Sequence, residues 1–64
     1  MIVLIFYVGN EFQLKGGKLR IVDINEEGDI FAELYIMRKN KVKDIIKYDY
    51  VSKETILSIL NEGV

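Results

Sequence analysis

An unbroken apolar segment, MIVLIFYV, fills residues 1–8 of a chain of only 64 residues. It is too short to cross a bilayer, which takes about 20 apolar residues, and no Lys or Arg precedes it as in a signal peptide. We therefore predict a strand with Phe6 on one face and Ile5 and Tyr7 on the other. Both faces of this strand are apolar, so both must be buried against other parts of the chain or against a partner. A cytoplasmic protein with no membrane contact is the default expectation.

The chain has no Cys and no His, so it has neither a disulfide bond nor the usual ligands of a structural zinc site. Half of its residues are apolar and 30% are charged, which is typical of globular proteins. We expect one domain, residues 1–64, without cofactor or metal. A chain near 60 residues buries only about 60% of its unfolded surface, so stability must come from packing or from association with other copies.

A glycine pair between two alternating apolar runs predicts a hairpin over residues 11–22. The sequence EFQLKGGKLRIV, residues 11–22, places Gly16 and Gly17 between two alternating runs. Such a dipeptide adopts the positive φ angles of two-residue hairpin turns. With that turn, Leu14 lies opposite Leu19, and apolar partners line one side of the hairpin.

A second hairpin follows through NEEGD, where Asn25 and Gly28 occupy the favoured first and fourth positions of a type I turn. The strand after it, residues 30–38, alternates strictly. Its register is open, because a four-residue loop sets Ile21 against Leu34, whereas a three-residue loop with a bulge at Gly28 shifts every pair by one. A shift by one residue exchanges the two faces.

RKNK, residues 38–41, predicts a further turn, and VKDIIKYDY predicts a long strand. That strand carries one apolar side, made of Val42, Ile46, Tyr48 and Tyr50. The tail predicts an amphipathic helix with Ser52 as N-cap and with an arc of four apolar residues, Ile56, Leu57, Ile59 and Leu60.

The predicted fold class is mainly β: an antiparallel four- to five-stranded meander or small barrel with one C-terminal α-helix. Residues 14–35, LKGGKLRIVDINEEGDIFAELY, resemble the central hairpins of small β-barrels of the Src-homology and KOW type. That resemblance implies glycine-flanked strands around a very small core. It carries no functional residues.

Catalytic chemistry is poorly represented in the sequence. Without His and Cys the usual proton shuttle and the most reactive nucleophile are absent. The acidic residues Glu26, Glu27 and Asp29 lie in a predicted turn and lack the spacing of a calcium loop. The lysines near Gly16 lack the phosphate-binding loop pattern. We therefore expect a protein that is not an enzyme.

Charge is unevenly distributed, although the net charge is only −1. Residues 23–33 hold acids and no base, whereas residues 38–47 hold bases and the single acid Asp44. Lysines on an edge strand commonly prevent aggregation. The alternative is a nucleic-acid site in segment 38–47, although the sequence pI of about 5.3 argues against it. Its candidate residues are Arg38, Lys39, Lys41, Lys43, Lys47 and Tyr48.

Apolar surface exceeds what one short helix covers, which favours a protein partner. Aromatic residues and Met are enriched in interface cores, and Phe31, Tyr35 and Met37 share the second face of their strand. We expect a homodimer, or a small non-enzymatic binding module that contacts a host protein as an inhibitor or adaptor. Abundant residues with AT-rich codons, such as Ile and Lys, indicate an AT-rich genome, as in a bacteriophage, a mobile element or a low-GC bacterium.

Overall fold

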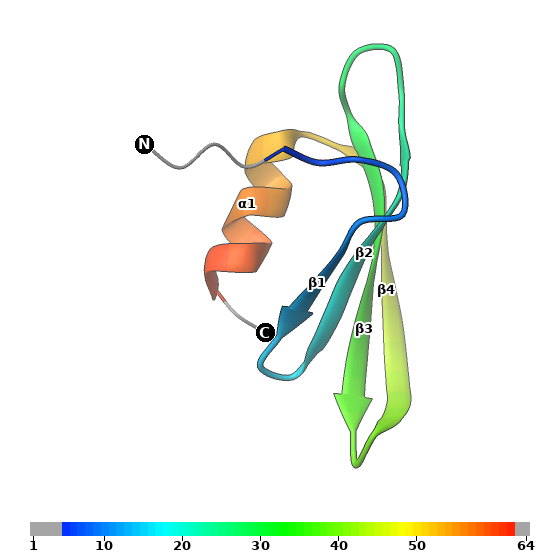
Figure 1. The fold of residues 1–64 in the computed structure, drawn as a ribbon, viewed down its shortest axis with the longest axis vertical. Helices are drawn as coiled ribbons and strands as arrows, with labels where there is room; N and C mark the ends of the chain where they lie inside the picture. The colour runs from blue at the N-terminus through cyan, green and yellow to red at the C-terminus, as the bar shows by residue number, and fades with distance from the viewer. Residues whose placement is uncertain (1–4, 63–64) are drawn as a thin grey trace.

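The computed structural model describes residues 5–62 and contains one antiparallel sheet and one helix (Figure 1). The sheet order is β1-β2-β3-β4, and consecutive strands pair as in a meander. The edge strands β1 and β4 do not pair with each other, so the sheet is open and not a closed barrel. The elements are β1 (Glu11–Leu14), β2 (Gly17–Ile24), β3 (Ile30–Arg38), β4 (Lys41–Val51) and α1 (Lys53–Glu62).

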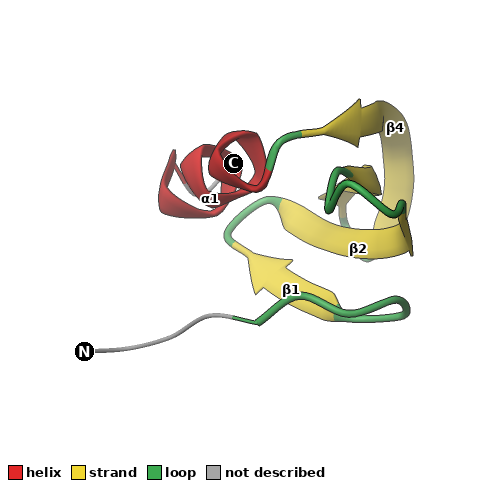
Figure 2. Cartoon of the chain, turned by 90° about the horizontal axis from the view of Figure 1, so that it is seen from above, coloured by secondary structure: helices red, strands yellow, loops and turns green. Residues whose placement is uncertain are grey.

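Helix α1 lies beside one face of the sheet, which we call the inner face (Figure 2). The core forms between them, because the apolar sides of β2 and β3 meet the apolar arc of α1. The opposite side of the sheet is the outer face. The buried residues are Phe6, Leu19, Ile21, Ile30, Ala32, Leu34, Ile56 and Ile59.

The predicted N-terminal strand is wrong for residues 5–8, and residues 1–4 lie outside the described part of the chain. The chain instead turns just before β1, where the N–H of Asn10 donates to the carbonyl of Tyr7 at 3.1 Å. Gly9 takes a φ of 89° in this turn, and its N–H donates to the carbonyl of Ile21 at 2.8 Å. Because this turn and the start of β1 lie along β2, residues 5–8 have no strand to pair with.

Phe6 is nevertheless a core residue, as its place in the apolar pattern predicts. It is buried and packs edge-on against Phe12, with 5.6 Å between the ring centroids. Its neighbours Ile5, Tyr7 and Val8 are exposed. One side chain of the described apolar run therefore anchors the N-terminal segment to the core.

The β1–β2 turn falls one residue earlier than predicted. Leu14 pairs with Gly17, so Lys15 and Gly16 form the turn. Gly17 is needed for a different reason, since a Cβ there would overlap the carbonyl oxygen of Tyr35 on β3. Relative to the predicted register, each residue of β1 therefore pairs with the β2 residue two positions earlier in the chain. Because side chains alternate with a period of two, the apolar side of the hairpin is unchanged.

The β2–β3 turn forms as predicted around Asn25. The N–H of Gly28 donates to the carbonyl of Asn25 at 3.0 Å, and Gly28 has a φ of 86°. The side chain of Asn25 also accepts hydrogen bonds from the N–H groups of Glu27 and Asp29, at 3.1 and 2.9 Å. Asn25 thus closes the turn with both its backbone and its side chain.

Beside the turn, the β2–β3 register is the second predicted alternative, a three-residue loop with Gly28 in the left-handed conformation. The N–H of Asn25 donates to the carbonyl of Asp29 at 3.0 Å, and Ile24 pairs with Ile30. A further bulge at Val22, which the sequence does not predict, then shifts the register once more and sets Leu19 opposite Leu34. The predicted faces of β3 are confirmed, because its even-numbered residues from 30 to 34 are buried and its odd-numbered residues lie on the outer face.

Lys39 and Asn40 form the tight β3–β4 turn within the predicted RKNK segment, with φ values of 52° and 64°. The predicted apolar side of β4 is wrong, because two bulges interrupt the strand, one between Val42 and Asp44 and one between Tyr48 and Val51. The first bulge moves Val42 to the outer face, away from Ile46 and Tyr48. The second does the same to Tyr50.

Helix α1 begins as predicted after Ser52, whose Oγ accepts the N–H of Thr55 at 3.2 Å. Ile56 and Ile59 are buried, and the rest of the predicted arc is partly buried against the core. Within residues 5–62, no helix has the length and apolar content needed to cross a membrane.

Candidate interaction surface

The centre of the outer face is a row of charges of alternating sign, which we call the charged row. Strand register places Glu11 opposite Arg20, Arg20 opposite Glu33, and Glu33 opposite Lys47. Opposite charges on directly paired residues stabilise a sheet modestly. The charged row is balanced across the four strands, and it divides the outer face into two halves.

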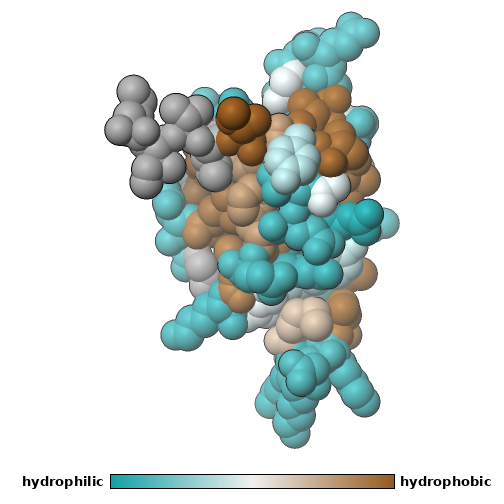
Figure 3. All heavy atoms as spheres, viewed as in Figure 1, coloured by the Kyte–Doolittle hydropathy of each residue, from teal (hydrophilic) through white to brown (hydrophobic). Residues whose placement is uncertain are grey.

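One half carries a continuous apolar surface on β3 and β4, which we call the β3–β4 patch. Tyr35 pairs with Ile45, and Met37 pairs with Val42. Val42 and Ile45 remain 49% and 43% exposed. Figure 3 shows brown, hydrophobic atoms directly above teal, hydrophilic side chains at the lower end of the molecule, where the β3–β4 turn lies.

Tyr35 is held in place by two polar contacts at the edge of the patch. Its hydroxyl donates to Oε1 of Glu33 at 2.7 Å, and the Nζ of Lys18 lies 5.4 Å from its ring centroid. The hydrogen bond to Glu33 is the main reason that the pKa of Tyr35 is raised above its ordinary value. The ring is therefore an oriented, neutral part of the patch.

Phe31 lies on the same outer face but on the other side of the charged row. It packs edge-on against Tyr50, with 5.6 Å between the ring centroids. The hydroxyl of Tyr50 donates to Oδ2 of Asp23 at 2.5 Å, which raises the pKa of Tyr50. The backbone of Tyr50 has a φ of 49°, which is unusual for an aromatic residue. The predicted set Phe31, Tyr35 and Met37 thus shares one face but forms two separate clusters.

Four of the predicted nucleic-acid residues lie together, in or beside the β3–β4 turn. We call this group, Arg38, Lys39, Lys41 and Lys43, the basic tip. The other two lie elsewhere: Lys47 belongs to the charged row, and Tyr48 is on the inner face, opposite Ala32 and packed against the core.

The acids lie at the opposite end of β3. Glu26, Glu27 and Asp29 belong to the β2–β3 connection, which we call the acidic turn. Within residues 5–62, no group of acidic side chains is placed to hold a metal ion. The two turns that flank β3 therefore carry opposite charges.

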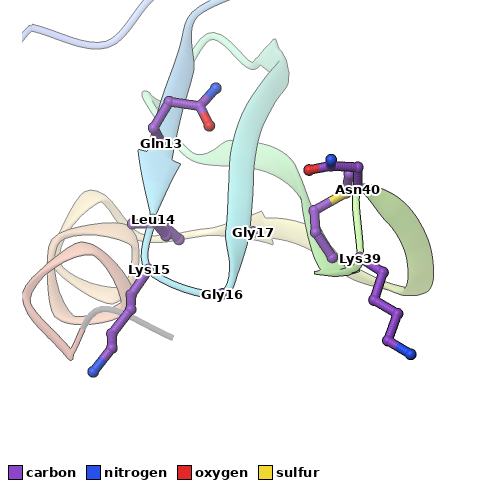
Figure 4. Close-up of a pocket in the computed structure, with 8 residues that line it drawn as sticks. Gln13, Leu14, Lys15, Gly16, Gly17, Lys39 and Asn40 are labelled. Atoms are coloured by element: carbon purple, nitrogen blue, oxygen red, sulfur yellow. The ribbon is translucent and has the colours of Figure 1, made fainter.

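A hollow of about 330 Å³ lies between the β1–β2 turn and the β3–β4 turn (Figure 4). The side chains of Lys15 and Lys39 extend away from it. Because Met37 lines the hollow and also belongs to the β3–β4 patch, the hollow extends the patch toward β1. Its lining residues are Gln13, Leu14, Lys15, Gly16, Gly17, Met37, Lys39 and Asn40.

The predicted site residues do not include Val42 and Ile45. Apolar spacing places Val42 on the other face of β4, because a bulge cannot be read from that spacing. A signal for Ile45 was present, since two consecutive isoleucines in a strand place one on each face. Ile46, the inner-face member of that pair, is 38% exposed.

No protein-family model matches the chain, and neither the curated proteins nor the solved structures contain a match to it.

Proposed function

We propose that this chain is a small non-enzymatic binding module that contacts a protein partner stoichiometrically through the β3–β4 patch. The observation that carries the proposal is the patch itself: Tyr35 and Met37 are half-buried and, with the exposed Val42 and Ile45, they form one apolar surface on the outer face. A Tyr and a Met at the centre of such a surface are typical of protein interfaces.

The surroundings of the patch indicate the chemistry of the partner. The basic tip borders the patch on one side, and the hollow beside Met37 offers room for a protruding side chain. Complementary charge fixes orientation and speeds encounter. We therefore expect a partner surface that is apolar at its centre and edged by carboxylates, on a larger host protein that the module inhibits or links to another.

The state of the tyrosine hydroxyls also supports a binding role over catalysis. Tyr35 and Tyr50 both donate to carboxylates, and both have raised pKa values. At neutral pH they are therefore protonated and already engaged, which makes them poor bases and poor nucleophiles. We also propose that a phage or mobile element encodes the chain.

The test compares Met37→Glu with the control Val22→Glu, because Val22 is an exposed outer-face residue outside the patch. Each variant is immobilised and exposed to host lysate, and captured complexes are weighed by native mass spectrometry. We expect a complex of fixed stoichiometry with the wild type and with Val22→Glu but not with Met37→Glu, and weaker capture at high salt. Equal capture by all three proteins, or no capture, would contradict the proposal.

A second candidate is nucleic-acid binding, which the basic tip favours because four bases gather at one turn with Tyr35 on the adjoining face. This function predicts binding to single- or double-stranded DNA or RNA that falls steeply with salt. Fluorescence anisotropy of labelled oligonucleotides measures it. Binding should be lost when Lys39, Lys41 and Lys43 are changed to Glu, and absence of binding at low salt would rule the candidate out.

A further inference from the structure

Strand β4 is a long edge strand. It has 11 residues and pairs only with β3, whereas the other edge, β1, has four residues. A free edge offers unpaired N–H and C=O groups to another strand, and short edge strands limit that risk. Edge β4 thus offers a longer run of unpaired backbone groups to another strand than edge β1 does.

The two bulges leave one regular stretch in β4. Residues 44–48 pair one-to-one with residues 36–32 of β3, without interruption, and Ile46 lies at the centre of this stretch. Ile45 is exposed on the outer face and Ile46 is 38% exposed on the inner face. The regular part of the edge therefore carries one partly exposed isoleucine on each face.

We infer that β4 pairs in antiparallel fashion with β4 of a second copy, about a twofold axis at Ile46, so that one sheet runs through both copies. In this register Ile46 lies opposite Ile46 of the other copy, Ile45 opposite Lys47, and Asp44 opposite Tyr48. Each pair joins residues of the same face, as a continuous sheet requires. Directly opposed isoleucines form a favourable cross-strand pair.

The charges select this register over its neighbour. A pairing centred on Ile45 would set Lys43 opposite Lys47, and directly opposed like charges are destabilising. The pairing centred on Ile46 places no two like charges opposite each other in residues 44–48. Beyond this stretch it brings Lys43 of one copy toward Asp49 of the other, so the basic end of each strand runs beside the acidic end of its partner.

Asp44 weakens this association. Its Oδ1 accepts the N–H of Ile45 at 2.8 Å within the single chain. The carboxylate must release this amide before the second strand binds it. Asp44 thus protects the edge of the monomer, and we expect Asp44→Ala to lower the dissociation constant of the dimer.

The dimer does not depend on the proposed function, because Ile46 lies on the inner face and outside the β3–β4 patch. It does affect that function, since both outer faces point to the same side of the joined sheet. The two patches would then form one broader surface.

Sedimentation equilibrium across a range of concentrations tests the inference. We expect the wild type to dimerise, and Ile46→Lys and Ile46→Glu each to raise the dissociation constant by about tenfold or more. An equimolar mixture of the two variants should restore a dimer, because opposite charges then meet at the axis. The control Val22→Lys, at the same 38% exposure as Ile46, should dimerise like the wild type.

Three results would overturn the inference: a wild type that stays monomeric at millimolar concentration, an Ile46 variant that dimerises normally, or a mixture that fails to associate. Met37→Glu should leave dimerisation intact, which separates this interface from the β3–β4 patch. Hydrogen exchange of the wild type needs no variant to fold. It should show protection of amides in residues 44–48 that increases with protein concentration, and unchanged protection would also overturn the inference.

Discussion

Helix α1 supplies one whole side of the core, so truncating its central residue should destabilise the entire protein. Ile56 is fully buried between α1 and the sheet, with 0% of its surface exposed. Replacing a buried Ile by Ala costs about 2–5 kcal/mol. At about 0.05–0.15 kcal/mol per residue, a domain of this length has a free energy of unfolding of roughly 3–10 kcal/mol. Ile56→Ala should therefore remove at least about a fifth of it.

Urea unfolding followed by far-UV circular dichroism measures this loss. Ile56→Val should cost about 1 kcal/mol and keep a measurable transition if Ile56→Ala is largely unfolded. Ser58→Ala, at an exposed position of the same helix, is the control and should change the free energy by no more than about 0.5 kcal/mol. All samples need one low protein concentration, because association adds to apparent stability. An Ile56→Ala cost equal to that of Ser58→Ala would refute the docking of α1.

Three further predictions concern backbone and polar contacts. Gly17→Ala should lower the free energy of unfolding by about 1–3 kcal/mol, because the added methyl overlaps the Tyr35 carbonyl; urea titration measures it, and a neutral effect would contradict the close approach. Asn25→Ala should cost about 1 kcal/mol in the same assay and Asn25→Asp, which keeps an acceptor oxygen, much less; equal costs would contradict the side-chain bonds. The hydrogen bond to Asp23 raises the pKa of Tyr50 in the folded protein. The bond therefore stabilises the fold fully below the ordinary tyrosine pKa of 10.0, and this stabilisation is lost as pH rises through the higher pKa of the folded state. Ultraviolet titration should show a lower pKa for Tyr50 in Asp23→Asn, and an unchanged pKa would contradict the bond.

Local patterns predicted those elements whose determinants lie close together in the chain. The alternation in residues 30–38 gave the correct faces of β3, Ser52 marked the start of α1, and Asn25 with Gly28 marked the turn between β2 and β3. In each case the side chains that define the element also make its contacts. These elements can be predicted from the sequence because they do not depend on contacts with distant parts of the chain.

The features that depend on distant partners were not predictable in the same way. Residues 5–8 look like a strand, but the β2 edge beside them is taken by the turn at Gly9 and by β1. Gly17 looks like a turn residue, but its need for space comes from β3. The bulges in β4 change which face Val42 and Tyr50 occupy, so Val42 joins the patch. Phe31 lies apart from the patch because the charged row separates them.

The opposite charges of the two turns that flank β3 give the molecule an electric dipole far larger than its net charge suggests. Nine residues of strand separate the acidic turn from the basic tip, a distance of about 30 Å at about 3.3 Å per residue. Because the net charge is only −1, this separation of charge shapes the field close to the molecule, within the roughly 10 Å that electrostatic interactions reach at 0.1 M salt. A nearby acidic surface therefore favours the orientation in which the β3–β4 turn, with its four basic residues, makes contact first.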